Sequence, residues 1–391
     1  MLRNRKYFIV IIAVALFLKL LLFVYASVYD PRIRFDNDSA DYLNTGMMLV
    51  THGVFAQEEN QVLKYELNRT PGYPLFLGIL HGILKIPLGG VIFVQVVLTL
   101  LAAWITYKAA LEINPRTAML AAIIVLYSQP IAIYSLMIMT EALYLLLISL
   151  FMLVFIRYLK KKESRLLLVS AILLALATYV RPVSYYLCAA IPLFIIYANI
   201  RDQFKKAILH AAVFLLIACG LLGVWQLRNY LVLHQNIFSS IIQGNQKKFG
   251  IFHSYAANSD PFTQGMPPLQ YYLNVTWRCF LSLMTRPVSY KYFHSYPLTV
   301  AGKIIGYPFV VFWFTGFLIG LSKVMRNKHY QFLACVILYF ICVTIGSDMW
   351  FSGERFRVPM IPFIAIISAA GWIALKDVLC KNEKKTILGA R

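Results

Sequence analysis

Charged residues are scarce in this sequence, and most of those present are basic. Of its 391 residues, 14% are charged and 60% are hydrophobic, and the mean hydropathy is +0.69. Soluble proteins carry about 25% charged and 45–50% apolar residues. The composition therefore excludes an ordinary soluble domain and indicates a polytopic membrane protein, with a single transmembrane domain over residues 1–391.

Several motifs are also missing. The six cysteines include no CxxC pair, and the seven histidines show no HxxxH spacing, so we expect neither a disulfide framework nor a zinc site. No internal repeat of the kind found in many secondary transporters is present. The 37 basic residues outnumber the 16 acidic ones, but no basic arm presents them in a soluble context, which favours cytoplasmic loops over nucleic-acid binding.

Long apolar runs are what the sequence has in abundance. A transmembrane helix needs about 20 such residues. Ten runs predict an all-α protein with about ten spans, the first of them uncleaved and starting in the cytoplasm: 7–26, 88–109, 117–134, 140–159, 166–180, 183–200, 207–227, 302–321, 330–345 and 358–375.

The run 72–85 is apolar but short for a span, and its role follows from the charges around it. If it crossed the bilayer, the three lysines at 160–162 would lie outside. If it lies along the outer interface, every short basic loop falls inside, as the positive-inside rule requires. We therefore expect residues 27–87 and 228–301 to form two long extracytoplasmic loops.

The first of these loops is acidic. Asp36 and Asp38 form a DxD pair, Asp41 follows, and the spacing from 38 to 50 predicts a short helix with Asp38 or Ser39 at its N-cap. Acids at a helix start need no catalytic role. A DxD pair also suits a divalent metal, although two carboxylates alone do not complete a coordination shell.

Arginines accompany these acids. Arg69 opens the segment RTPGYPLF, and its planar guanidinium suits a lipid head group or the phosphate of a lipid-linked substrate. Further polar residues stand at predicted outer ends of spans, where they are either interfacial anchors, ion pairs or parts of a site. They are Glu141, Arg181, Arg228, Glu354, Arg355 and Arg357.

Taken in order, the segments DSADYLNTGMMLVTHGVF, NRTPGYPLFLGIL, TEALYLLL, ATYVRP, WQLRNYLVLHQNIFSS and RFRVPMIPF resemble the GT-C superfamily of membrane glycosyltransferases. The branch is that of protein O-mannosyltransferases and the lipid A aminoarabinose transferase, and the resemblance covers residues 1 to about 372. It implies a polyprenyl-phosphate sugar donor, transfer with inversion outside the membrane, and two juxtamembrane helices in the first outer loop. It also implies that an aspartate of this loop is the general base, which is Asp38 by its position relative to Tyr42.

The sequence departs from that branch at Asn68, where the aminoarabinose transferases have a glutamate. The identity of a second carboxylate therefore stays open between Glu66, Glu141 and none, with Asp36 and Asp41 as further helpers. For the donor phosphate we expect Arg69 first, then Arg181, Arg355, Arg357 and Arg228. No segment resembles the large soluble C-terminal domain of many relatives, so acceptor recognition is expected in 228–301.

The sequence thus predicts an inverting glycosyltransferase that moves a sugar from a polyprenyl-phosphate donor to a lipid, glycan or protein acceptor. No cofactor is expected, with a divalent metal at Asp36 and Asp38 as the alternative. A transporter or flippase of a lipid-linked sugar is the rival function, but transporters place ionisable groups near the midplane, and Lys19 is the only clear intramembrane charge. We expect a multi-pass protein of a bacterial inner membrane, in contact with membrane lipids and not nucleic acid, with its site facing outward.

Overall fold

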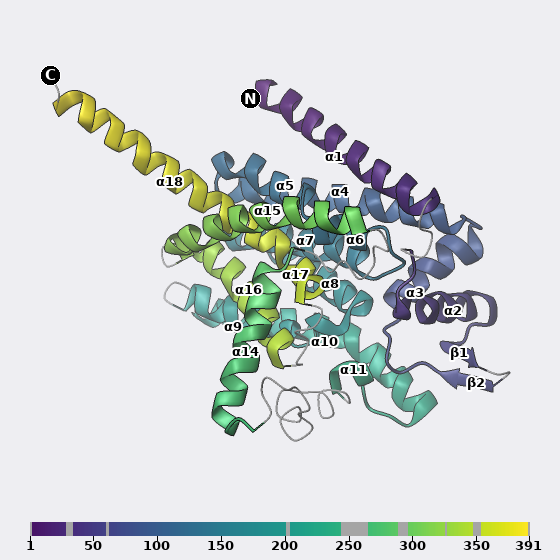
Figure 1. The fold of residues 1–391 in the computed structure, drawn as a ribbon. Coiled ribbons are helices and arrows are strands. Elements are labelled where there is room, and N and C mark those ends of the chain that lie inside the picture. The colour runs from purple at the N-terminus through teal and green to yellow at the C-terminus, as the bar shows by residue number, and fades with distance from the viewer. Residues whose placement is uncertain are drawn as a thin grey trace.

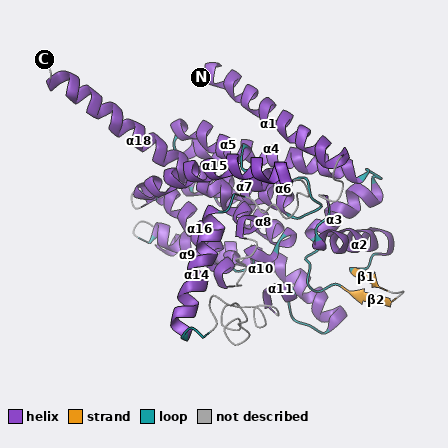
Figure 2. Cartoon of the chain, in the orientation of Figure 1, coloured by secondary structure: helices purple, strands orange, loops and turns teal. Residues whose placement is uncertain are grey.

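A computed structural model describes residues 2–28, 34–59, 62–200, 204–243, 265–287, 296–324, 327–346 and 353–389. Within these ranges the chain is helical except for one two-stranded antiparallel hairpin and short connections (Figure 2). The predicted all-α membrane fold is confirmed.

The N-terminal half contains α1 (Leu2–Val28), α2 (Asn37–His52), β1 (Ala56–Glu59), β2 (Val62–Tyr65), α3 (Gly72–Leu77) with its π-helical continuation Gly78–Ile83, α4 (Leu88–Ile113), α5 (Ala118–Leu126), α6 (Gln129–Tyr134), α7 (Glu141–Lys161) and α8 (Ser164–Val180). The remainder contains α9 (Leu187–Asn199), α10 (Phe204–Leu233), α11 (Ser240–Gln243), α14 (Pro268–Thr285), α15 (Tyr296–Val324), α16 (Lys328–Gly346), α17 (Gly353–Arg357) and α18 (Ile361–Gly389).

Seven of the ten predicted spans coincide with helical segments that are long and apolar enough to cross a membrane. The other three correspond to shorter apolar helices at Ile9–Tyr25, Pro115–Leu126 and Ser164–Val180. The chain is an integral, multi-pass membrane protein. In Figure 1 both chain ends lie on the upper side of the bundle, whereas the hairpin β1–β2 lies at its lower right.

The predicted span 117–134 is wrong as a single helix. α5 ends at Leu126, Ser128 is extended, and α6 begins at Gln129. In a continuous helix Pro130 would leave the carbonyl of Leu126 without its hydrogen bond, and its ring would clash with that carbonyl. In the first turn of α6 the missing N–H costs nothing.

The centre of the bundle is formed by α7 and α18. The most apolar stretches of these two segments are 67% and 78% buried, against 33% for α10 and α15, which therefore present more of their surface outward. α15 packs closely on α18 because glycines face each other there. A Cβ on Gly371 would overlap the carbonyl oxygen of Gly316, the kind of close approach that small residues permit between membrane helices.

Between α1 and α4 lie the two helices expected there, α2 and α3, together with the hairpin β1–β2, which was not predicted. α2 packs on α3 and its π-helical continuation, where Gly46 and Gly78 allow the two backbones to meet. α2 begins at Asn37, so the N-cap is Asp36 and not the predicted Asp38 or Ser39. Instead, the Ser39 hydroxyl accepts from the Asp36 backbone N–H at 2.9 Å, half of a capping box.

A candidate arginine–carboxylate active site

Arg69 stands in the turn that leads into α3 and joins that turn to the first helix of the loop. Its Nη2 donates to Asp38 Oδ1 at 2.7 Å and to Asp41 Oδ2 at 3.2 Å. Both acids lie in the first two turns of α2, on the side that faces α3. The Tyr42 ring lies 5.0 Å from the same guanidinium, a cation–π contact.

Arg355, from α17 near the other end of the chain, contacts the same aspartate. Its Nη2 donates to Asp38 Oδ2 at 3.3 Å, while its Nε donates to Glu141 Oε1 at 2.6 Å. Asp36 Oδ2 lies 3.8 Å from its Nη1. Arg355 therefore joins the carboxylates at the start of α2 to the carboxylate that begins α7.

Glu141 is the buried end of this arrangement. The Arg181 Nη1, just past the end of α8, donates to the same Glu141 Oε1 at 2.8 Å, and the Phe356 ring lies 5.4 Å from its guanidinium. We call this set the arginine–carboxylate network. Its members are Asp36, Asp38, Asp41, Arg69, Glu141, Arg181 and Arg355.

The carboxylates of the network differ in how deeply they are buried. Side-chain exposure is 2% for Glu141, 27% for Asp38 and 40% for Asp41, so one end is sealed and the other is open. Four carboxylates share three guanidinium groups, which leaves little net charge among them. An incoming anion can therefore compete with a carboxylate for guanidinium hydrogen bonds, and Asp38 and Asp41 are the accessible carboxylates.

These contacts set the pKa of Asp38. Burial alone would raise it, but the charges of Arg69 and Arg355 and their hydrogen bonds outweigh burial and hold the pKa below the ordinary value of 3.8. Asp38 is therefore a carboxylate at neutral pH, and a weak base as long as both arginines hold it.

A chain of buried residues behind the network was missed by the sequence analysis. Tyr42 meets Tyr73 edge-on at 5.1 Å between ring centroids, and the Tyr73 hydroxyl donates to Gln95 Oε1 at 2.6 Å. Gln95 Nε2 donates in turn to the carbonyl of Met137 at 2.6 Å. This chain fixes α2 and α3 against the buried segment that leads into Glu141. A glutamine in the apolar run 88–109 was the one available signal.

Two guanidinium nitrogens in this region are buried without a hydrogen bond among the described residues. They are Nε of Arg69 and Nε of Arg34, a residue whose backbone carbonyl accepts from the Ile138 N–H at 2.9 Å. Buried donors are normally satisfied. Both are therefore available to an anionic ligand, and Arg34 was not among the predicted residues.

The predicted helper Glu66 has a different task. It is 7% exposed, and its Oε1 accepts from the backbone N–H groups of Asn68 and Arg69, at 2.6 and 3.0 Å. It thus shapes the turn that presents Arg69, and in the described part of the chain its carboxylate makes no contact with a side chain of the network. At Asn68 the sequence departs from the aminoarabinose transferases. Its side-chain oxygen accepts a hydrogen bond from the Ser240 hydroxyl, which connects the turn to α11.

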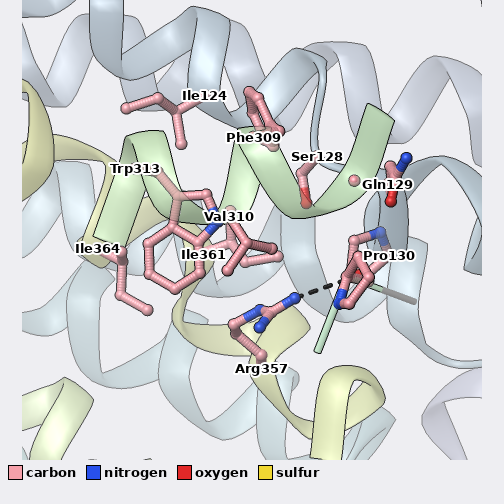
Figure 3. A pocket seen from close by; sticks show the side chains of 12 residues that line it. Ile124, Ser128, Gln129, Pro130, Phe309, Val310, Trp313, Arg357, Ile361 and Ile364 are labelled. Atoms are coloured by element: carbon pink, nitrogen blue, oxygen red, sulfur yellow. Dashed lines mark hydrogen bonds between the residues drawn. The ribbon is translucent and has the colours of Figure 1, made fainter. Parts of the chain in front are cut away.

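Two predicted phosphate ligands lie elsewhere. Arg357 is 2% exposed and donates to the carbonyls of Leu283 and Arg286, at 2.9 and 2.6 Å. Figure 3 shows it beside Trp313 in an apolar pocket whose free volume, about 10 Å³, is close to the least that holds one water molecule. Arg228 lies 4.9 Å from the Trp225 ring centroid and donates to the Asn229 side chain.

The acids do not fit the predicted alternative of a divalent metal. Both oxygens of Asp38 already accept from guanidinium groups, whose positive charge opposes a cation at the same oxygens. No cluster of three or more His, Cys, Asp or Glu side chains suited to a metal occurs among residues that the structure describes. We therefore derive no step through a metal.

Comparison with known proteins points to the class that the resemblance implied. Residues 68–225 match the family model described as dolichyl-phosphate-mannose-protein mannosyltransferase. This range contains Arg69, Glu141 and Arg181. No curated protein sequence matches the chain.

The fold matches that of an oligosaccharyltransferase from Archaeoglobus fulgidus. One structure, in complex with an inhibitory peptide and a dolichol-phosphate, has a TM-score of 0.59 and 12% identity over 99% of this chain and 52% of its own. The apo form has a TM-score of 0.59 and 14% identity over 98% and 52%. A third, with Zn and sulfate, has a TM-score of 0.56 and 12% identity over 96% and 51%. The chain thus spans about half the length of these proteins, and the resemblance to the GT-C superfamily is confirmed.

Proposed function

We propose that this chain, which matches a mannosyltransferase family over residues 68–225 and shares the fold of an archaeal oligosaccharyltransferase, is an inverting glycosyltransferase with a polyprenyl-phosphate sugar as donor. The observation that carries the proposal is the convergence of Arg69 and Arg355 on Asp38. A base and the cations that a departing phosphate needs thereby stand in one partly open site.

In the proposed reaction the acceptor hydroxyl attacks the anomeric carbon from the face opposite the phosphate. A bond from the acceptor oxygen to this carbon forms, the bond from the carbon to the phosphate oxygen breaks, and the hydroxyl proton passes to the Asp38 carboxylate. The polyprenyl phosphate leaves with the bonding electron pair, and the guanidinium groups of Arg69 and Arg355 stabilise its charge. Because phosphate is a good leaving group, no second carboxylic acid is required, unlike in glycosidases.

Donor binding and base strength are coupled in this proposal. A phosphate that takes guanidinium hydrogen bonds from Asp38 removes the contacts that keep its pKa low, so the donor itself makes Asp38 a stronger base. Glu141 stays behind as the buried partner that holds Arg181 and Arg355 in place. The unpaired Nε of Arg69 and that of Arg34 add donors for the same phosphate.

We place the site at the extracytoplasmic face. α7 begins at Glu141, in the network, and ends with Lys160 and Lys161 in its last turn. Its 21 residues give about 30 Å at 1.5 Å per residue, the thickness of the hydrocarbon core. Since basic residues collect on the cytoplasmic side, the opposite end of α7 faces outward. Acceptor contacts are proposed for 228–301, of which residues 244–264 and 288–295 lie outside the described residues.

The proposed function is tested by replacing its proposed base, Asp38. We expect Asp38→Asn to lower the rate of sugar transfer from a polyprenyl-phosphate donor about 10²- to 10⁴-fold, the contribution of a positioned general base. Glu58→Gln on the exposed hairpin is the matched control and should transfer normally. Turnover of Asp38→Asn within a few fold of normal would remove Asp38 from the mechanism. If the unaltered protein moved a lipid-linked sugar across vesicle membranes without transferring it, the transferase assignment would fail.

A further inference from the structure

A polar cavity lies at the opposite end of the bundle from the arginine–carboxylate network. It has a volume of about 240 Å³ and is formed where the end of α4, the end of α15, the start of α16 and the middle of α18 meet. Asp377, on its wall, stands 16 residues after Ile361, about 24 Å along α18 from the beginning of that helix. The cavity is therefore separate from the candidate active site.

Hydrogen-bond donors line this cavity. Its polar residues are Asn114, Arg116, Lys323, Asn327, Tyr330 and Asp377, and the rest of the lining is apolar. Arg116 and Asp377 form a two-bond ion pair, with distances of 3.0 and 2.6 Å. With its charge matched in this way, Asp377 repels an incoming anion less.

Lys323 carries a positive charge that no acidic residue of the cavity lining balances. Among the described residues, neither its ammonium group nor the hydroxyl of Tyr330 has a hydrogen-bond or ion-pair partner. The Asn327 side-chain oxygen accepts from the backbone N–H of His329 at 2.8 Å, which leaves the amide NH₂ as a donor. The site thus offers a cation and several donors to one small anion.

The size of the cavity and its surroundings indicate what kind of anion fits. Its volume is about eight times the ~30 Å³ that a water molecule occupies in the liquid, and it falls below the roughly 300 Å³ at which sites for drug-sized ligands begin. A head group fits there if the rest of its molecule lies outside. Exposed apolar side chains stand close in sequence to lining residues: Leu321 precedes Lys323 by two positions in α15, and Val378 and Leu379 directly follow Asp377 in α18.

We propose that this cavity binds the phosphate head group of an anionic phospholipid, with Lys323, Asn327 and Tyr330 as its ligands. The acyl chains lie along Leu321, Val378 and Leu379. On the orientation proposed above, this end of the bundle faces the cytoplasm, where anionic lipids and basic pockets between helices meet. The site would anchor α15, α16 and α18 to one another without touching the residues of sugar transfer.

The experiment measures lipid binding to the purified full chain, stripped of native lipid in detergent. Phosphatidylglycerol, phosphatidylcholine and inorganic phosphate are titrated separately, and binding is followed by native mass spectrometry and by the shift in melting temperature. We expect phosphatidylglycerol to bind and to raise the melting temperature more than phosphatidylcholine does. Lys323→Ala should weaken phosphatidylglycerol binding about tenfold, the usual effect of losing one hydrogen bond to a charged group.

Lys376→Ala is the matched control, because Lys376 is exposed on α18 beside Asp377 but does not line the cavity. It should bind phosphatidylglycerol as the unaltered chain does, and Lys323→Arg should restore most of the affinity. Equal binding by Lys323→Ala and Lys376→Ala would overturn the site. If inorganic phosphate alone gave the same Lys323-dependent shift at equal concentration, the assignment to a lipid would be overturned in favour of a soluble phosphate.

Discussion

Asp38 is held by two arginines, and this single carboxylate determines how the site should respond to pH. Its pKa lies below 3.8, so it stays ionised in the free enzyme throughout the physiological range. By linkage, its ion pairs stabilise the fold at pH above the unfolded-state pKa, and this contribution is lost as pH falls through the lower, folded-state value. Activity that depends on the ionised form should therefore fall only in acid.

Arg69→Ala should shift the pH at which activity falls in acid to a higher value. Of the two guanidinium groups that act on Asp38, Arg69 lowers its pKa more. Removing Arg69 therefore raises the pKa of this carboxyl. We expect the acid limb of kcat/KM against pH to shift to higher pH, and kcat/KM at neutral pH to fall roughly 100-fold with the loss of one donor to the leaving phosphate. Arg69→Lys, which keeps the charge, should leave the acid limb nearly in place. An unshifted limb in Arg69→Ala would mean that Asp38 is not the titrating group.

Glu141→Gln tests the buried end of the network. This change leaves Arg181 without its anionic partner and Arg355 with only its aspartates, in a site where Glu141 is 2% exposed. Breaking a buried ion pair costs about 3–5 kcal/mol. The matched change Glu112→Gln, in a more exposed ion pair with Arg157 and Lys160, should cost no more than about 1 kcal/mol. Denaturant or thermal unfolding in detergent compares the two, and equal losses would contradict a structural role for Glu141.

At the scale of elements, the network depends on how closely α3 approaches α8. A Cβ added to Gly72, at the start of α3, would lie 2.7 Å from the backbone of Tyr179, closer than real contacts allow. Gly72→Ala should therefore push the turn that carries Arg69 away from Arg181 and lower sugar transfer at least tenfold, with little change in the amount of folded protein. Gly220→Ala in α10, where no atom lies within 4 Å, is the control for the same substitution. Equal activity of the two variants would show that this approach does not position the site.

The elements also show what the sequence could and could not predict. Length and hydropathy located the membrane helices because lipid demands a continuous apolar segment with internally satisfied backbone groups. The interruption at Ser128–Pro130 was missed, although Pro130 signals it, because the apolar residues on both sides add up to the length of one span. The hairpin β1–β2 was missed because its strands are only four residues long. Asp38, Arg69 and Glu141 were all predicted as site residues, but their pairing depends on tertiary packing, as does the separation of Arg357 and Arg228 from the network.

At the scale of the whole molecule, the proposed orientation follows from charge at the two ends of the bundle. It predicts that the hairpin is outside and the end of α7 inside. In a cysteine-free background, Glu58→Cys should react with a membrane-impermeant maleimide in intact cells. Lys161→Cys, at a position that is also exposed, should react only after the membrane is permeabilised. The reverse pattern would place the network on the cytoplasmic side and exclude an extracytoplasmic donor.

The contact between Asp38 and Arg355 joins residues 317 positions apart, and it has a consequence for biosynthesis. A chain inserted into the membrane from its N-terminus presents Asp38 and Arg69 early, but Arg355 follows only after α16 has been made. Until then Asp38 has one guanidinium partner, and Glu141 lacks the shorter of its two guanidinium hydrogen bonds. On the proposed function, the growing chain therefore gains a complete site only after α17, which carries Arg355, has been made.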